Sequence, residues 1–93
     1  MMRIIEINGN KFSNVSGFYK EVERQMIAGL NWKMGRNLDA FNDILSGGFG
    51  VHEVGEKFIL KWHRSDKSKS ELKEFKRIIE IIKSNPHIEL ILT

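Results

Sequence analysis

Three short runs of strand type, separated by amphipathic helical segments, constrain the fold of this chain most strongly. The runs occupy residues 3–7, 57–62 and 88–92. Strands joined by helical crossovers pair in parallel, because the helix returns the chain to the end of the sheet where it started. The sequence therefore predicts an α/β fold, a single small domain over residues 1–93 with a three-stranded parallel sheet flanked by helices. Residues 57–62 are apolar at nearly every position, which predicts a central strand buried on both faces.

The first helix is expected after Ser13 or Ser16, since either hydroxyl can cap a helix, and Gly29 is expected to end it. Its apolar positions fall at helical spacing and predict one buried stripe. These positions are Phe18, Val22 and Met26.

A second helix is expected from its cap at Asn37 to the glycines that begin at Gly47. The polar segment 63–70 then predicts a loop, and Ser70 is expected to cap a long helix that ends before Pro86. The predicted core residues of these two helices are Leu38, Phe41, Ile44 and Leu45 in the first, and Leu72, Phe75, Ile78, Ile79 and Ile82 in the second.

Several classes of function are disfavoured by what the sequence lacks. There is no cysteine, which excludes disulfides, thiolate zinc sites and cysteine nucleophiles. His52, His63 and His87 lack metal-ligand spacing and are expected at the surface. The glycines at 47–50 follow a helix and precede a strand, the reverse of a phosphate-binding loop. We therefore expect no metal, no cofactor and no enzymatic activity.

Apolar runs of the length that spans a bilayer are missing, and the first residues do not resemble a signal peptide. We expect a cytoplasmic protein that does not associate with membranes.

The charges are unevenly distributed along the chain. The net charge is +3, yet residues 37–56 contain four acidic residues and no Lys or Arg. Two of the four, Asp39 and Asp43, are spaced i, i+4 on the second predicted helix and therefore share one helix face. Such a face is either simply solvated or the binding site of a basic partner.

The last part of the chain is basic. Residues 57–93 carry nine Lys or Arg against five acids, and Trp62 adds an aromatic ring beside them. Aromatic and cationic side chains together occur in proteins that bind single-stranded nucleic acid. Two observations disfavour nucleic-acid binding: Trp62 ends a strand that is predicted to be buried, and lysines usually form the solvated face of a helix.

Residues 35–47, with the sequence GRNLDAFNDILSG, resemble the signature of the barstar family, intracellular inhibitors of secreted microbial ribonucleases. The turn at Ile7-Asn8-Gly9 and a strand that ends in Trp62 are similar to the family as well. The resemblance covers nearly the whole chain and implies a three-stranded parallel sheet. It also implies one-to-one binding of a basic ribonuclease, in which helix carboxylates take the place of RNA phosphates.

The family motif maps onto particular residues. Asp39 and Asp43 match the two aspartates that contact the nuclease, with Asp43 at the position of the main phosphate mimic. Asn37 and Gly35 match the rest of the binding segment, and Glu80 matches a peripheral acidic contact on the long helix.

The sequence departs from the family pattern where the best-known inhibitor has aromatic contacts. Lys33, Asn42 and Gly48 replace aromatic residues at these positions, and Lys33 and Asn42 join the predicted partner-binding set. The leading hypothesis is a ribonuclease inhibitor. The alternatives are the same fold with a different basic protein partner or, less favoured, a nucleic-acid binding module.

Overall fold

The computed structural model describes residues 3–26, 37–46 and 56–93, and within them three strands form one sheet. The strands are β1 (Arg3–Asn8), β2 (Phe58–His63) and β3 (Ile88–Leu92). The helices are the short 3₁₀ turn η1 (Gly9–Lys11), α1 (Val15–Met26), α2 (Leu38–Ser46), α3 (Ser65–Glu71) and α4 (Phe75–Lys83). All strands pair in parallel, so the predicted fold class is confirmed.

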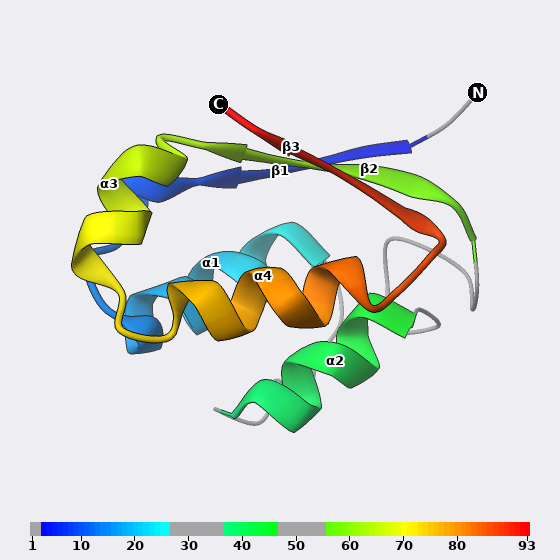
Figure 1. Ribbon diagram of the computed structural model, residues 1–93, viewed down its shortest axis with the longest axis horizontal. Coiled ribbons are helices and arrows are strands. Elements are labelled where there is room, and N and C mark those ends of the chain that lie inside the picture. The colour runs from blue at the N-terminus through cyan, green and yellow to red at the C-terminus, as the bar shows by residue number, and fades with distance from the viewer. Residues whose placement is uncertain (1–2, 27–36, 47–55) are drawn as a thin grey trace.

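The strand order β1-β2-β3 explains where the helices lie. Both crossovers step across the sheet in the same direction, and crossovers between parallel strands are almost always right-handed. Two such steps place their helices on the same face. Figure 1 shows α1, α2 and α4 together below the sheet, and no helix of the described residues covers its upper face, which we call the bare face.

The bare face corrects one prediction about β2. Phe58, Leu60 and Trp62 are almost fully buried beneath the helices, whereas Ile59 and Lys61, which alternate with them, are only partly buried. The central strand is therefore buried on one face, and the prediction of burial on both faces is wrong. Burial on both faces requires helices on both sides of a sheet, and this topology supplies them on one.

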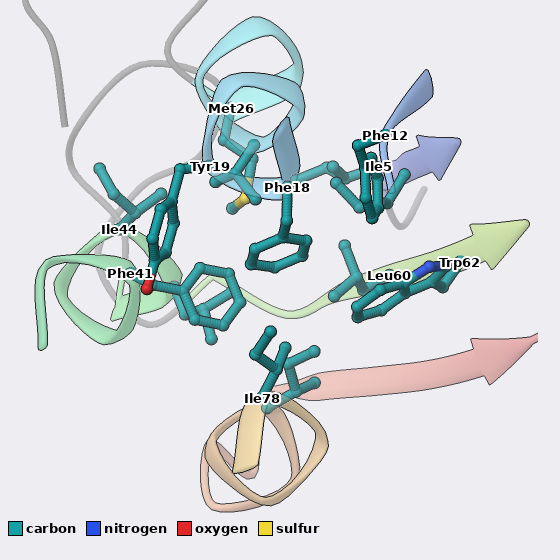
Figure 2. Packing of buried hydrophobic residues seen from close by; sticks show 14 of the residues in the cluster. Ile5, Phe12, Phe18, Tyr19, Met26, Phe41, Ile44, Leu60, Trp62 and Ile78 are labelled. Atoms are coloured by element: carbon teal, nitrogen blue, oxygen red, sulfur yellow. The ribbon is translucent and has the colours of Figure 1, made fainter. Parts of the chain in front are cut away.

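The core is built around the ring of Phe18 on α1. This ring stacks on Trp62 of β2 with a centroid distance of 5.2 Å and an interplanar angle of 16°. It also meets the ring of Phe41 on α2 edge to face, at 5.2 Å. Figure 2 shows Phe18 between these two rings. The aromatic contacts thus join the sheet, α1 and α2 in one cluster.

The predicted serine cap of the first helix is wrong. Asn14 is the capping residue, because its Oδ1 accepts a hydrogen bond of 2.8 Å from the backbone N–H of Gly17. Asparagine is as good a cap as serine, so the sequence pattern leaves the choice open. The predicted end at Gly29 lies outside the described residues.

The segment after β2 also differs from its prediction. The sequence predicts a loop over residues 63–70, but α3 begins at Ser65 and includes the predicted cap Ser70. The chain then becomes extended at Leu72, and α4 begins at Phe75. Leu72 is buried in the core, so one long helix is replaced by two short helices with an anchored residue between them.

Tertiary contacts explain why polar residues form α3. The buried indole N–H of Trp62 donates to the hydroxyl of Ser68 at 3.0 Å. The ammonium of Lys67 donates to the carbonyl of Phe12 at 2.8 Å and bonds the carboxylate of Glu71 at 2.7 Å. Trp62 belongs to the strand before α3 and Phe12 lies 55 positions from Lys67 in the chain, so a pattern of local polarity does not include these two partners.

The turn that follows β1 requires a glycine. Gly9 is buried, and a Cβ atom there would lie 2.6 Å from the carbonyl oxygen of His63 and 2.8 Å from that of Arg64. Both neighbours are backbone atoms, so they cannot move aside without shifting the end of β2. The Asn8-Gly9 turn signal seen in the sequence is therefore a packing requirement as well as a turn.

We expect Gly9→Ala to destabilise the fold by about 1–3 kcal/mol, because the added methyl group overpacks a rigid backbone contact. Urea unfolding followed by circular dichroism measures this difference. Asn10→Ala, at the exposed neighbouring position, is the control and should change stability by less than about 0.5 kcal/mol. Equal free energies of unfolding for the two variants would show that the backbone around position 9 can shift without a loss of stability.

Candidate functional site

Helix α2 begins at the residue predicted from the sequence. The Oδ1 of Asn37 accepts a hydrogen bond of 2.8 Å from the backbone N–H of Ala40, and its carbonyl accepts one from the N–H of Phe41. This geometry is that of an N-cap, so the prediction for Asn37 as the cap is confirmed. The cap fixes where the acidic helix starts.

The packing of α2 decides which of its side chains face outward. Phe41, Ile44 and Leu45 are buried at i, i+3 and i+4 and form the inner face of the helix. Residues advance by about 100° around a helix, so positions 39 and 43 lie opposite the centre of this face and position 42 lies beside it. The exposed side chains of α2 include Asp39, Asn42 and Asp43.

The two aspartates present unneutralised charge. Neither Asp39 nor Asp43 has an ion-pair or hydrogen-bond partner among the residues that the structure describes. Asp39 lies in the first turn, where the helix dipole favours a negative charge, but Asp43 lies beyond it. Their mutual repulsion costs a few tenths of a kcal/mol at this spacing. Asp43 makes no ion pair or hydrogen bond in the described part of the chain that would stabilise the fold.

A groove of about 230 Å³ separates α2 from α4. Asp39 and Asn42 line it from α2, and Glu80 lines it from α4. The structure therefore brings together three of the residues predicted for the partner-binding set, from segments that are far apart in the sequence. Asp43 is exposed one turn along α2 from Asp39.

The same groove contains residues that the sequence analysis did not single out. Arg77 of α4 and Ser84, the residue that follows α4, also line it, and Arg77 has no carboxylate within 4 Å among the described residues. In the sequence, Arg77 is one of many cations on the basic helix. Its i, i+3 spacing from Glu80 was the one available signal that both share a face.

Two residues between α4 and β3 hold the far end of α2. The side-chain amide of Asn85 donates to Oδ1 of Asn42 at 3.0 Å and to the carbonyl of Ile81 at 2.9 Å. The ring N–H of His87 donates to the carbonyl of Leu45 at 2.8 Å. Leu45 is in the last turn of α2, whose carbonyls lack partners within the helix. His87 is thus partly buried and caps α2, where the sequence predicted a surface histidine.

The remaining predictions for the site can be placed briefly. Lys33 and Gly35 lie outside the described residues, as do His52 and the glycines at 47–50. Across residues 3–26, 37–46 and 56–93, no group of three His, Asp or Glu side chains is arranged to hold a metal ion. In the same ranges, no helix is long and apolar enough to cross a membrane.

Comparison with protein families gives one match. Residues 2–86 match the family model Barstar, described as barstar (barnase inhibitor). The matched span is nearly the whole chain and includes α2, α4 and every residue of the predicted partner-binding set. A search of curated proteins finds no significant match.

We expect His87→Ala to destabilise the protein by about 1 kcal/mol, since it removes one partly buried hydrogen bond to a helix terminus. Amide hydrogen exchange should quicken first in the last turn of α2. His63→Ala is the matched control, because the partners of His63, Glu6 and Thr93, are exposed on the bare side of the sheet. Unchanged exchange in α2 would contradict the capping role of His87.

Proposed function

The chain belongs to the barstar family, and we propose that it is a ribonuclease inhibitor that binds a basic microbial ribonuclease one-to-one and blocks its active site. Asp39 and Asp43 take the positions of RNA phosphates in the cationic cleft of the nuclease. Inhibition needs no chemistry and no cofactor from this chain. The protein acts in the cytoplasm as an immunity protein against a toxic nuclease.

The proposal rests on one observation: helix α2 is anchored on the core and presents the two carboxylates of Asp39 and Asp43 to solvent. Phe41, Ile44 and Leu45 fix α2 on the core, and Asp39 and Asp43 are exposed without a described partner. Because the helix is already ordered, binding costs little additional conformational entropy. Arg and Lys side chains that bind RNA phosphates bond carboxylates equally well, through charge-assisted hydrogen bonds.

The other predicted contacts surround these two charges. Glu80 extends the negative surface across the groove to α4, and Asn42 offers an amide whose oxygen already accepts from Asn85. Asn37, Lys33 and Gly35 belong to the start of α2 and the segment before it. We propose that this segment contacts the rim of the nuclease cleft.

A different basic protein is the second candidate partner. Asn42 replaces an aromatic contact of the family, and its bond to Asn85 makes the centre of the surface polar. Polar contacts discriminate partners by hydrogen bonding, whereas aromatic anchors supply affinity through buried area. This feature favours a partner that differs from the best-known nuclease in the residues at the centre of the interface.

The direct test is titration of a basic, guanyl-preferring microbial ribonuclease with this protein while RNA cleavage is followed. We expect stoichiometric inhibition, and we expect Asp43→Ala to weaken binding by at least about thirtyfold, since removing one partner of a buried charge pair costs about 2–5 kcal/mol. Asp66→Ala on α3 is the matched control, because Asp66 is an exposed aspartate outside the groove.

Two outcomes would contradict the proposal in different ways. Inhibition that Asp43→Ala leaves unchanged would exclude the phosphate-mimic mechanism. Absence of inhibition would exclude this nuclease as the target, and a pull-down that recovers another basic protein in an Asp43-dependent manner would establish the second candidate.

Charge should control the rate of association. We expect the association rate constant to fall steeply as salt is added, because screening weakens steering between the acidic surface and a basic enzyme. Asp39→Asn should slow association and Arg77→Gln should speed it, since the two substitutions change the charge of one groove in opposite directions. Stopped-flow fluorescence measures both rates, and a salt-independent rate would exclude steering by this surface.

A further inference from the structure

A second groove, of about 580 Å³, lies between α4 and the end of β3 and is unrelated to the aspartates of α2. Its floor is apolar and its rim is basic. The apolar lining residues are Leu72, Phe75, Ile79 and Leu92, and the charged ones are Lys69, Lys73, Lys76, Lys83 and Glu80. The proposed inhibition does not use this surface, apart from Glu80, which borders both grooves.

The apolar floor includes a side chain that the fold leaves uncovered. Leu92 pairs in register with Trp62, so its side chain points toward the helix-covered face of the sheet. Trp62 is fully buried there, but Leu92 is 45% exposed. Helix α4 therefore does not cover the whole apolar face of β3, and the end of the strand at Leu92 stays exposed.

The strand beside this groove has a free edge. The N–H of Phe58 donates to the carbonyl of His87, and the N–H of Thr93 donates to the carbonyl of Trp62. Backbone groups alternate in direction along a strand, so those of Leu90 and Leu92 point away from β2. In the described part of the chain, β3 has no strand on that side. A free edge of this kind can receive another strand.

The rim has an unbalanced positive charge. Lys69, Lys73, Lys76 and Lys83 are all exposed, and none has a carboxylate within 4 Å among the residues that the structure describes. Glu80 is the one acidic residue of the groove. The charge complement of this surface is therefore negative.

We propose that this groove binds an extended, acidic and amphipathic segment of a partner protein, which pairs with β3 as a fourth strand. Every second side chain of a strand points to the same face, so the groove-facing positions of this segment, apolar and acidic in turn, cover Leu92 and Ile79 and pair with the lysines of the rim. Figure 1 shows β3 above α4, where it crosses in front of β1 and β2. Strand addition of this kind combines main-chain hydrogen bonds with side-chain pockets.

The chemistry of the groove favours a peptide over RNA. Single-stranded RNA is held by aromatic faces on which bases stack. The one aromatic ring in the groove, Phe75, is partly buried and lies edge to face with Trp62 at a centroid distance of 5.2 Å. The rest of the floor is aliphatic, which suits leucine or valine side chains.

The first test uses a fluorescent synthetic peptide with the repeat Val-Thr-Glu-Thr, which places valine and glutamate on the same face of a strand, and a peptide with the repeat Val-Thr-Lys-Thr is the control for charge. We expect saturable binding of the acidic peptide at low salt. The double variant Lys73→Glu, Lys76→Glu should weaken it by about tenfold or more, because each substitution replaces an attraction between opposite charges with a repulsion between like charges. Lys11→Glu with Lys20→Glu makes the same charge change outside the groove and should retain binding.

The second test separates strand addition from apolar contact. Leu92→Pro removes an N–H that points away from β2 and leaves the β2–β3 hydrogen bonds in place, as edge strands permit. Leu92→Ala removes most of the side chain and keeps the N–H. We expect the proline variant to bind the acidic peptide several-fold more weakly than the alanine variant. In the native protein, bound peptide should slow amide hydrogen exchange at Leu90 and Leu92.

Several results would overturn the proposal. The first is that the acidic peptide shows no saturable binding. The second is that the basic peptide binds as tightly as the acidic one. The third is that the proline and alanine variants bind the acidic peptide with equal affinity. Tighter binding of a single-stranded RNA at the same lysines would assign the groove to nucleic acid. Concentration-dependent dimerisation that the Lys73→Glu, Lys76→Glu pair abolishes would assign it to a second copy of the chain. Ribonuclease inhibition is measured separately, so either proposal can fail alone.

Discussion

The stacking of Phe18 on Trp62 is the contact on which the rest of the structure depends. Trp62 lies at the end of the central strand, and the hydrogen bond from its indole N–H to Ser68 fixes α3. The other side of Phe18 meets Phe41, which fixes α2. Sheet, crossover helices and acidic helix are therefore oriented by one set of rings, whose pairwise geometry is more restrictive than that of aliphatic side chains.

The acidic helix has a second anchor at its far end. Asn85 and His87 bond to Asn42 and Leu45 from the segment that leads into β3, so α2 is held both by the core and by a distant part of the chain. A helix as short as α2 has marginal stability in isolation, and these tertiary contacts supply the stability that its length does not. Two carboxylates that repel each other can be displayed on such a helix because its stability does not depend on them.

The strand order places the two proposed binding surfaces on helices and on a sheet edge. In doubly wound folds a ligand crevice forms where the strand order reverses. The order β1-β2-β3 of the described strands has no reversal, so these strands create no crevice of that kind. Helix α4 instead borders two grooves of opposite character, acidic toward α2 and basic toward β3, with Glu80 between them. This separation explains how a chain of net charge +3 can present an acidic surface.

The sequence by itself determined the elements that depend on local pattern. The runs of strand type predicted the three strands. The cap at Asn37 and the buried stripe of Phe41, Ile44 and Leu45 predicted α2. The same periodicity placed Asp39 and Asp43 on the outer face of that helix, because helix periodicity is a property of neighbouring residues. Only the tertiary structure decided the rest. It turned a polar segment into α3, made His87 a cap, and joined Glu80 to Asp39 across a groove. These features rest on contacts between residues far apart in the chain, whose energies no local pattern contains.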